Sequence, residues 1–283
     1  MEPFNIQINN LNIHGLKAGS GDEVVIALHG WLDNSASYIP MLANAKVQQT
    51  WYCLDFAGHG LSSWRSDDAH YYFVDYIDDI YQFINTLGVK KIHLVGHSMG
   101  AMVAGVFASC FSDYVTSVTF IEGIGCVTTP SEEVTQQLKS AILNRERLKN
   151  KKPRVYQSKE QIHQARAQTT DLSSQLIEVL MVRNIKTIKN GFALTTDPKL
   201  KNHSGFRFDE AQCIGAIKNL IAPCQLILGD TGYTFVKQNL ENYAKYYNSL
   251  NVITVEGGHH CHMQSSAHCF EQIQAFMVQS SVC

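Results

Sequence analysis

The sequence lacks an excess of charge of either sign, a long hydrophobic run and a basic or apolar N-terminus. Its formal net charge is -2 at pH 7, so the chain has no overall field that would gather nucleic acid or an anionic membrane. No segment approaches the ~20 apolar residues of a membrane span, and residues 1–7 resemble no targeting segment. We therefore expect a cytoplasmic protein that binds no nucleic acid, does not span a membrane and acts on a small-molecule partner. None of these features indicates an oligomeric state.

The sequence also lacks a Cys-x-x-Cys pair, an internal repeat and a low-complexity tract. Its eight cysteines are scattered, and several fall inside apolar strand or helix patterns. We expect them to be free, largely buried thiols in a reducing compartment. They are Cys53, Cys110, Cys126, Cys213, Cys224, Cys261, Cys269 and Cys283.

What the sequence does contain is apolar material for one large core, since 45% of its 283 residues are hydrophobic. Short β-branched runs alternate with helical periods, which is typical of an α/β fold with a parallel sheet and crossover helices. The runs that we predict to be strands are 24–28, 51–55, 92–96, 118–122, 225–229 and 252–256. Residues 4–8 and 11–15 predict an antiparallel hairpin at the edge of the sheet. Apolar residues from Phe73 to Leu87 predict a helix that ends at Gly88.

This alternation breaks after Glu122, and strand-like sequence returns only at Gln225. About a hundred residues are too many for one crossover, so we predict an inserted cap. Its helices are expected over 132–148, 159–168 and 172–183. The predicted organisation is a first core segment at 1–123, a helical cap at 124–215 and a second core segment at 216–283.

A Gly-x-Ser-x-Gly motif at residues 96–100 is the first candidate for chemistry. It follows an apolar strand and precedes a helix-like run rich in small residues, the setting that a nucleophile elbow requires. A serine on this tight turn projects from the carboxyl edge of the sheet, near the positive end of the following helix. We therefore predict Ser98 as a nucleophile.

The run His29-Gly30-Trp31 ends the predicted strand that would lie beside the nucleophile strand. A glycine there lets the backbone turn so that the next amide points at a bound carbonyl oxygen. The amides of Trp31 and Met99 are therefore the candidate oxyanion hole. For His29 we favour a structural role in bracing the loop.

Three segments together resemble the α/β-hydrolase superfamily: residues 29–34 (HGWLDN), 55–62 (DFAGHGLS) and 96–100 (GHSMG). More narrowly they are similar to the serine hydrolase-like branch. The resemblance implies an eight-stranded, mostly parallel sheet flanked by helices, with an inserted helical cap. It also implies an ester-type hydrolase without a metal or organic cofactor. Dehalogenases and epoxide hydrolases share this fold but use an aspartate nucleophile, so Ser98 argues against both chemistries.

The general base comes last in the chain order of this fold. His259 follows the final predicted strand and two glycines, which matches the family's Gly-His pattern, and His260 is the alternative. The run His259-His260-Cys261-His262 also resembles a metal-binding cluster. Consecutive loop residues rarely converge on one ion, so we predict no metal site.

The acid that orients the histidine has two candidates. Many superfamily members carry an Asp in a Gly-x-x-Asp arrangement after the strand equivalent to 225–229, but here Gly232 stands at that place and Asp230 lies against the strand end. Glu122 closes the strand that follows the nucleophile's crossover helix. Neighbouring parallel strands present their carboxyl ends on one edge, so Glu122 would share a rim with Ser98. We favour Glu122 over Asp230, and a structural Glu122 stays open.

Two other features stand near this chemistry. Asp55 and Asp33 are the other carboxylates near the sheet's edge. Asp55 begins the Gly-His-Gly loop and is expected to bind local backbone amides. From Lys139 to Arg166 there are nine Lys or Arg against two Glu. This basic stretch is a solvated helix face or, as the sharper alternative, a surface for an acidic substrate or a phosphopantetheine carrier.

The sequence therefore predicts a carboxylesterase-like serine hydrolase that forms an acyl-enzyme. A carboxylic ester of small to medium size is the leading substrate class, and a thioester is second. An acyltransferase or a carbon–carbon bond hydrolase would use the same residues. A hydrolase-fold protein that binds a ligand without turnover is the non-enzymatic alternative.

Overall fold

The computed structural model describes residues 1–43, 45–149 and 154–281, and it contains one eight-stranded sheet in the order β1-β2-β4-β3-β5-β6-β9-β10. The pairs β1·β2 and β2·β4 are antiparallel and all other neighbours are parallel. The strands are β1 (Glu2–Ile8), β2 (Leu11–Ala18), β3 (Val24–Leu28), β4 (Thr50–Leu54), β5 (Ile92–His97), β6 (Val115–Ile121), β9 (Cys224–Gly229) and β10 (Leu250–Val255). The predicted α/β fold, its eight-stranded sheet and its N-terminal hairpin are confirmed.

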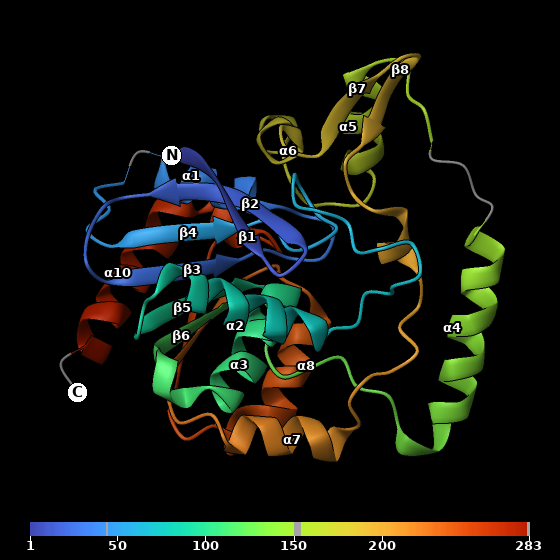
Figure 1. The fold of residues 1–283 in the computed structure, drawn as a ribbon. Coiled ribbons are helices and arrows are strands. Elements are labelled where there is room, and N and C mark those ends of the chain that lie inside the picture. The colour runs from blue at the N-terminus through green and yellow to red at the C-terminus, as the bar shows by residue number, and fades with distance from the viewer. Residues whose placement is uncertain (44, 150–153, 282–283) are drawn as a thin grey trace.

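Helices cover both faces of this sheet (Figure 1). One face packs against α2 (Asp75–Leu87), α3 (Met99–Cys110), α7 (Glu210–Lys218) and α8 (Thr234–Tyr243), and the other against α1 (Ile39–Leu42), α9 (Cys261–Gln264) and α10 (Ser266–Ser281). The predicted helix before Gly88 is confirmed, and Gly88 ends α2 with a left-handed φ of 69°. Glycine is suited to this place because it has no Cβ to oppose a positive φ.

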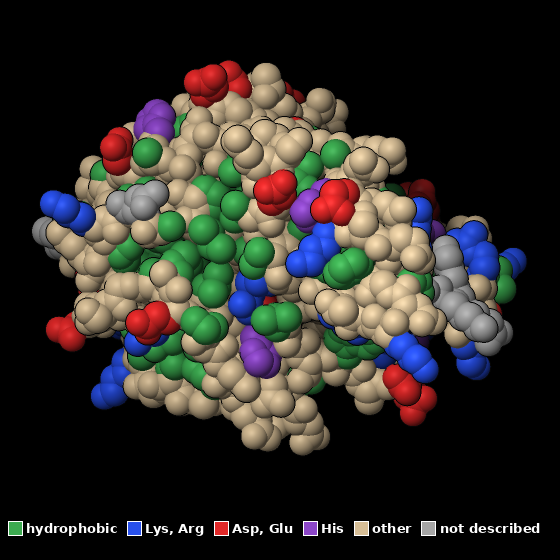
Figure 2. All heavy atoms as spheres, turned by 90° about the horizontal axis from the view of Figure 1, so that it is seen from above, with side chains coloured by type: hydrophobic (Ala, Val, Ile, Leu, Met, Phe, Trp, Pro, Cys, Tyr) green, Lys and Arg blue, Asp and Glu red, His purple; other side chains and the backbone are tan. Residues whose placement is uncertain are grey.

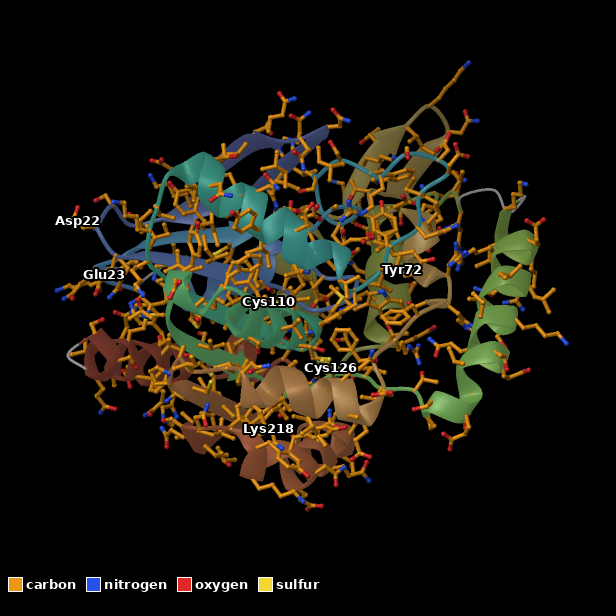
Figure 3. All side chains as sticks on the ribbon, turned by 60° about the horizontal axis from the view of Figure 1, so that its bottom comes forward. Asp22, Glu23, Tyr72, Cys110, Cys126 and Lys218 are labelled. Atoms are coloured by element: carbon orange, nitrogen blue, oxygen red, sulfur yellow. The ribbon has the colours of Figure 1, made fainter. Side chains whose placement is uncertain are left out.

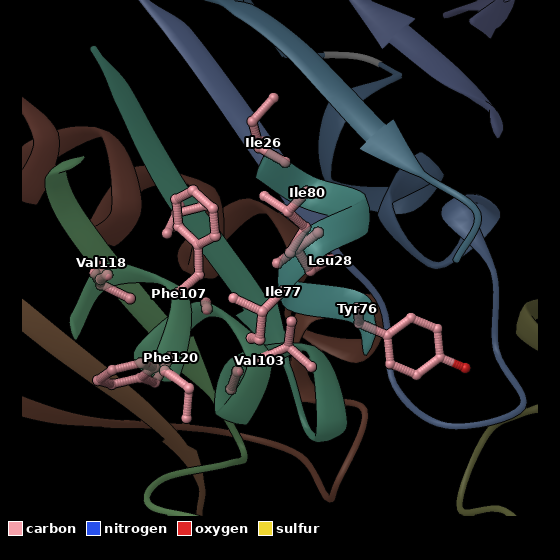
Figure 4. Packing of buried hydrophobic residues seen from close by; sticks show 14 of the residues in the cluster. Ile26, Leu28, Tyr76, Ile77, Ile80, Val103, Phe107, Val118 and Phe120 are labelled. Carbon is pink, nitrogen blue, oxygen red and sulfur yellow. The ribbon is translucent and has the colours of Figure 1, made fainter. Parts of the chain in front are cut away.

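The first face shows how the sequence pattern builds the core (Figure 4). Ile26 and Leu28 of β3 are two residues apart, so both point to the same side of the sheet. There they meet buried side chains of α2 and α3, including Ile80 and Phe107. Each fully buried side chain of this kind contributes about 1.5–3 kcal/mol relative to an exposed one. This packing fixes β3 and β5 side by side, with their carboxyl ends on one edge.

The inserted segment contains helices in all three predicted places: α4 (Val134–Lys149), α5 (Lys159–Ala167) and α6 (Ser174–Met181). It also contains a two-stranded sheet that the sequence reasoning missed, formed by β7 (Ile185–Ile188) and β8 (Gly191–Leu194). The hairpin, α5 and α6 pack around their own apolar cluster, whereas α4 stands apart from them (Figure 1). The expected boundary between residues 215 and 216 falls inside α7, whose Cys213 and Ile217 both pack into the main core.

The seven described cysteines are free thiols, and all except Cys110 are buried, whereas Cys283 lies outside the described residues. Figure 3 shows Cys126 beside α7.

Within the described ranges, no helix has both the length and the apolar character that crossing a membrane requires. Seen from above, charged side chains of both signs are scattered over the surface (Figure 2).

Candidate active site

Ser98 lies on a strained turn between β5 and α3. Its φ of 51° and ψ of −115° are unusual for a residue with a side chain, and its amide donates a 2.9 Å hydrogen bond to the Ile121 carbonyl on the neighbouring strand β6. Side chains at Gly96 and Gly100 would overlap backbone atoms of the adjoining helix and strand. These two glycines therefore let β5, α3 and β3 approach closely enough to hold the serine in this conformation.

The side chains of Ser98, His259 and Glu122 lie in one hydrogen-bonded row. His259 Nε2 is 2.9 Å from Ser98 Oγ, and His259 Nδ1 is 3.2 Å from Glu122 Oε2. Glu122 is 1% exposed and His259 is 8% exposed, so little water competes for these contacts. With a proton on Nδ1, the imidazole donates to Glu122 and accepts the Ser98 hydroxyl hydrogen on Nε2. This is the arrangement that a serine needs to lose its proton to a base.

The two candidate acids occupy different places. Besides facing His259, Glu122 accepts hydrogen bonds from the amides of Gly229 at 2.9 Å and Tyr233 at 3.2 Å. Asp230 is exposed, and its Oδ1 accepts a 2.9 Å hydrogen bond from the Gly257 amide. Asp230 therefore braces the loop that leads to the histidine, whereas Glu122 contacts the imidazole.

The candidate oxyanion donors flank the serine from two segments. Met99 is the first residue of α3, where amides have no partner within the helix. In the part of the chain that the structure describes, the amides of Met99 and Trp31 donate no hydrogen bond to a protein atom. The Trp31 side chain is 52% exposed, and its Nε1 donates to the Leu200 carbonyl at 3.3 Å. A side chain at Gly30 would approach His97 Nδ1 to 2.9 Å, so this turn requires glycine.

The structural interpretation of His29 agrees with its contacts. Its Nδ1 donates to the Gly30 carbonyl at 2.7 Å and its Nε2 accepts from the Phe56 amide at 3.0 Å. Burial lowers the pKa of His29, which favours the neutral ring that these contacts require. Asp55 also behaves as expected, because its carboxylate accepts from the amides of Ser35 and Leu61 at 2.8 and 2.9 Å.

His260, the alternative base, is held by two carboxylates. Its Nδ1 lies 2.8 Å from Asp171 Oδ1 and its Nε2 lies 3.3 Å from Asp33 Oδ2. Arg166 of α5 pairs with the other oxygen of Asp33 at 2.6 Å. Despite its burial, the two carboxylates raise the pKa of His260 to about 9, and His260 in turn lowers the pKa of Asp171 to about 2. A protonated ring with both nitrogens occupied is a poor base, so these contacts favour His259 in that role.

Among the residues that the structure describes, one group of side chains has the donor atoms to bind a metal ion. Asp33, His97 and His260 each offer an atom within 4.8 Å of the others. This set differs from the consecutive run 259–262, which supplies only His260 to it. The two cations His260 and Arg166 already balance the carboxylates of Asp33 and Asp171. The cluster is therefore explained by the charges of the protein itself.

Some residues of the basic stretch of the cap make contacts inside the protein. Arg166 pairs with Asp33, and Arg145 donates to the Tyr72 hydroxyl at 3.2 Å, on the side of the core that faces α4 (Figure 3). Lys139, Arg147 and Lys149 are exposed on α4. Lys151 and Lys152 lie outside the described residues.

The sequence reasoning missed two groups at this site. The first is Tyr233, whose ring is stacked on His259 with centroids 3.9 Å apart and an angle of 9° between the planes. The second is the pair of arginines that anchor the cap, Arg166 on Asp33 and Arg183 on Asp55. Tyr233 could have been noticed because it directly follows Gly232, the position already considered for the acid. No local pattern connects the arginines with their partners.

Comparisons with known proteins agree with this architecture. The sequence model of a family described as "alpha/beta hydrolase fold" matches residues 23–266. A "Serine hydrolase-like protein" from Danio rerio is 28% identical over 254 residues, which cover 85% of this chain and 77% of the relative. The crystal structure of a hypothetical protein from Pseudomonas aeruginosa PAO1 has a TM-score of 0.90 and 28% identity, over 97% of this chain and 100% of that one. A thioesterase domain from the curacin biosynthetic pathway has a TM-score of 0.83 at 20% identity, over 97% of this chain and 99% of that one, and shows the fold alone.

Proposed function

Because the chain belongs to the alpha/beta hydrolase fold family, we propose that it is a serine hydrolase that cleaves a carboxylic ester through an acyl-enzyme. The observation that carries the proposal is the hydrogen-bonded row of Ser98, His259 and Glu122. A serine hydroxyl is a weak nucleophile unless a base removes its proton as it attacks. The row supplies that base and a buried carboxylate to orient it. Because serine forms an ester that water then hydrolyses, the row fits acyl transfer.

The first half-reaction forms the acyl-enzyme. His259 Nε2 takes the proton from Ser98 Oγ, which attacks the ester carbonyl and places negative charge on its oxygen. The amides of Trp31 and Met99 donate to this oxyanion, an effect that is worth a few kcal/mol in the transition state. His259 then gives the proton to the leaving alcohol as the carbon–oxygen bond breaks. Glu122 holds the tautomer and stabilises the imidazolium throughout.

The second half-reaction regenerates the enzyme. His259 takes a proton from water, the hydroxide attacks the acyl carbonyl, and the Ser98 oxygen leaves with the proton that His259 returns. An acyltransferase would differ only in the acceptor that replaces water, and a carbon–carbon bond hydrolase only in the bond that breaks. The residues for both alternatives are the same, so a substrate panel separates them.

Labelling with a fluorophosphonate tests the nucleophile, because an elbow serine beside a neutral imidazole reacts with it near neutral pH. We expect the wild type to be labelled and Ser98→Ala to be unlabelled with nearly unchanged thermal stability. Ser109→Ala, on the same α3, is the control and is expected to be labelled normally. Undiminished labelling of Ser98→Ala would falsify this assignment. Turnover of acyl esters supports the enzyme, whereas tight ligand binding without turnover supports the receptor alternative.

A thioester carried by an acidic or phosphopantetheine-bearing partner is the second substrate class. The observation that favours it is the exposure of Lys139, Arg147 and Lys149 on α4. Replacing Lys139 and Lys149 by Glu is expected to raise KM for a carrier-bound thioester more than for a neutral ester, chiefly at low salt. Equal changes for both substrates would leave this surface as a solvated helix face.

A further inference from the structure

The ring of Tyr233 lies parallel to the imidazole of His259. The two centroids are 3.9 Å apart and the planes differ by 9°, which is close stacking. Tyr233 directly precedes α8 and is 51% exposed, whereas His259 is 8% exposed. One face of the tyrosine ring therefore covers the histidine, while much of the rest of the side chain meets solvent.

Stacking restrains a motion that hydrogen bonds leave free. The hydrogen bonds to Glu122 and Ser98 involve the two nitrogens at the edge of the His259 ring. Edge contacts alone allow the ring to tilt out of its plane. A parallel ring at 3.9 Å blocks that tilt on one side. The His97 ring also lies near His259, with centroids 4.9 Å apart at an angle of 51°, and its Nε2 donates to the His259 carbonyl at 2.8 Å.

The same short turn also holds the acid. The amide of Tyr233 donates to Glu122 Oε2 at 3.2 Å, and the amide of Gly229 donates to Glu122 Oε1 at 2.9 Å. Between them, Gly232 leaves room for the carboxylate, since a Cβ there would overlap its atoms. The turn from Gly229 to Tyr233 thus contacts the acid through its backbone and the base through one aromatic ring.

We propose that Tyr233 is a positioning residue for His259, and this inference rests on the proposed function. Its ring fixes the plane of the imidazole, and its negative π face stabilises the imidazolium that forms when His259 takes the Ser98 proton. The aromatic face carries the effect, so the tyrosine hydroxyl is dispensable. Tyr233 acts through His259 and needs no contact with the substrate.

We expect the other titratable groups near His259 to keep their contacts when Tyr233 is changed. Glu122 faces Nδ1, the His97 ring lies 4.9 Å away, and the His260 ring is 5.4 Å away on the same loop. Burial and the neighbouring histidines lower the pKa of His97, which favours its neutral form. His260 keeps the carboxylates that raise its pKa to about 9. A change in the pH profile of a Tyr233 variant therefore reports on the stacked pair.

The test compares Tyr233→Leu and Tyr233→Phe on one activated ester. Leu removes the π face, so kcat is expected to fall about 2- to 10-fold, the range of an aromatic pair, with KM nearly unchanged. The acidic limb of kcat/KM is expected to move to lower pH, because the imidazolium loses a favourable contact. Phe keeps the ring and is expected to match the wild type in both respects. Phe235→Leu, two residues along α8 and 42% exposed, is the control and is expected to show neither change.

Three results would overturn the proposal. The first is a normal kcat and pH profile for Tyr233→Leu. The second is a fall in kcat for Tyr233→Phe as large as that for Tyr233→Leu. The third is a change confined to KM, which would make Tyr233 a substrate contact. The wild type separates this inference from the proposed function. If it neither turns over esters nor reacts with fluorophosphonate, the serine hydrolase assignment fails. If it does both and Tyr233→Leu equals it, only the role of Tyr233 fails.

Discussion

His260 Nδ1 lies 2.8 Å from Asp171 Oδ1, and this contact ties the loop that carries His259 to the cap. Asp33 faces the other ring nitrogen of His260 and belongs to the loop that carries Trp31. One protonated imidazole therefore joins three segments that meet at the candidate site. The charge on His260 stabilises this junction.

Raising the pH is expected to weaken the fold through His260. Its pKa is about 6.5 in an unfolded chain and about 9 in the fold, so the native state holds the proton more tightly. This contribution is fully present below pH 6.5 and is lost as pH rises through about 9; it amounts to about 3 kcal/mol. Urea unfolding at pH 6, 8 and 10 should show a steeper loss of stability for the wild type than for His260→Gln.

The exposed histidine of α10 gives the matched control. His268→Gln is expected to lose stability with pH as steeply as the wild type does, since His268 is outside the cluster. Equal slopes for His260→Gln and the wild type would show that His260 does not carry the effect.

Removing Arg183 is expected to destabilise the protein by about 3–5 kcal/mol, because it leaves the fully buried Asp55 carboxylate without its cation. Arg183 Nη2 and Nε lie 2.6 and 3.1 Å from Asp55 Oδ2. Denaturant unfolding of Arg183→Met measures the loss, and Lys189→Met, an exposed residue of the same cap, is the control. Adding Asp55→Asn to Arg183→Met should recover part of the stability; a further loss instead would mean that the buried charge is not the cause.

Much of the fold could be predicted because its signals are local. The elbow at residues 96–100, the alternating strands and the Gly88 stop each depend on neighbours in sequence. The β7–β8 hairpin was also signalled locally, by Asn190 in its two-residue turn and Gly191 directly after it, but it was overlooked inside the predicted cap. The anchoring of the cap could not be predicted, because Arg166 and Asp33 meet only once the whole chain has folded.

The choice of acid shows the same limit. Glu122 closes one predicted strand and Asp230 directly follows another, and the corresponding strands β6 and β9 are neighbours, so the rim argument that favoured Glu122 could not decide between them. The structure places the Glu122 carboxylate beside His259 and leaves Asp230 on the Gly257 amide. Sequence alone carries no information on which side chain turns toward the histidine.

Glu122→Gln is expected to lower kcat by up to ~10⁴ with little loss of folding, because an amide can neither hold the required tautomer nor stabilise the imidazolium. Asp230→Asn is the matched variant and is expected to retain most activity, since its contact is with the Gly257 amide. The measurement is kcat/KM on one activated ester, with circular dichroism to verify folding. A crippled Asp230→Asn beside a nearly normal Glu122→Gln would place the acid after β9.

Moving the carboxylate from position 122 to position 232 is expected to restore part of the activity that Glu122→Gly loses. A Cβ at Gly232 would overlap the Glu122 carboxylate, so the two positions share one space and Gly232→Asp alone should be destabilising. Glu122→Gly empties that space and suits the positive φ of 47° at residue 122, while Gly232 has no positive φ to strain an aspartate. The double variant should therefore regain at least ~10-fold in kcat over Glu122→Gly, because a carboxylate again faces His259 Nδ1. The control pairs Glu122→Gly with Gly215→Asp, which adds the same charge on α7 where a side chain meets no neighbour. If the 232 variant folds but is no more active than this control, the carboxylate at Glu122 is not what makes His259 a base.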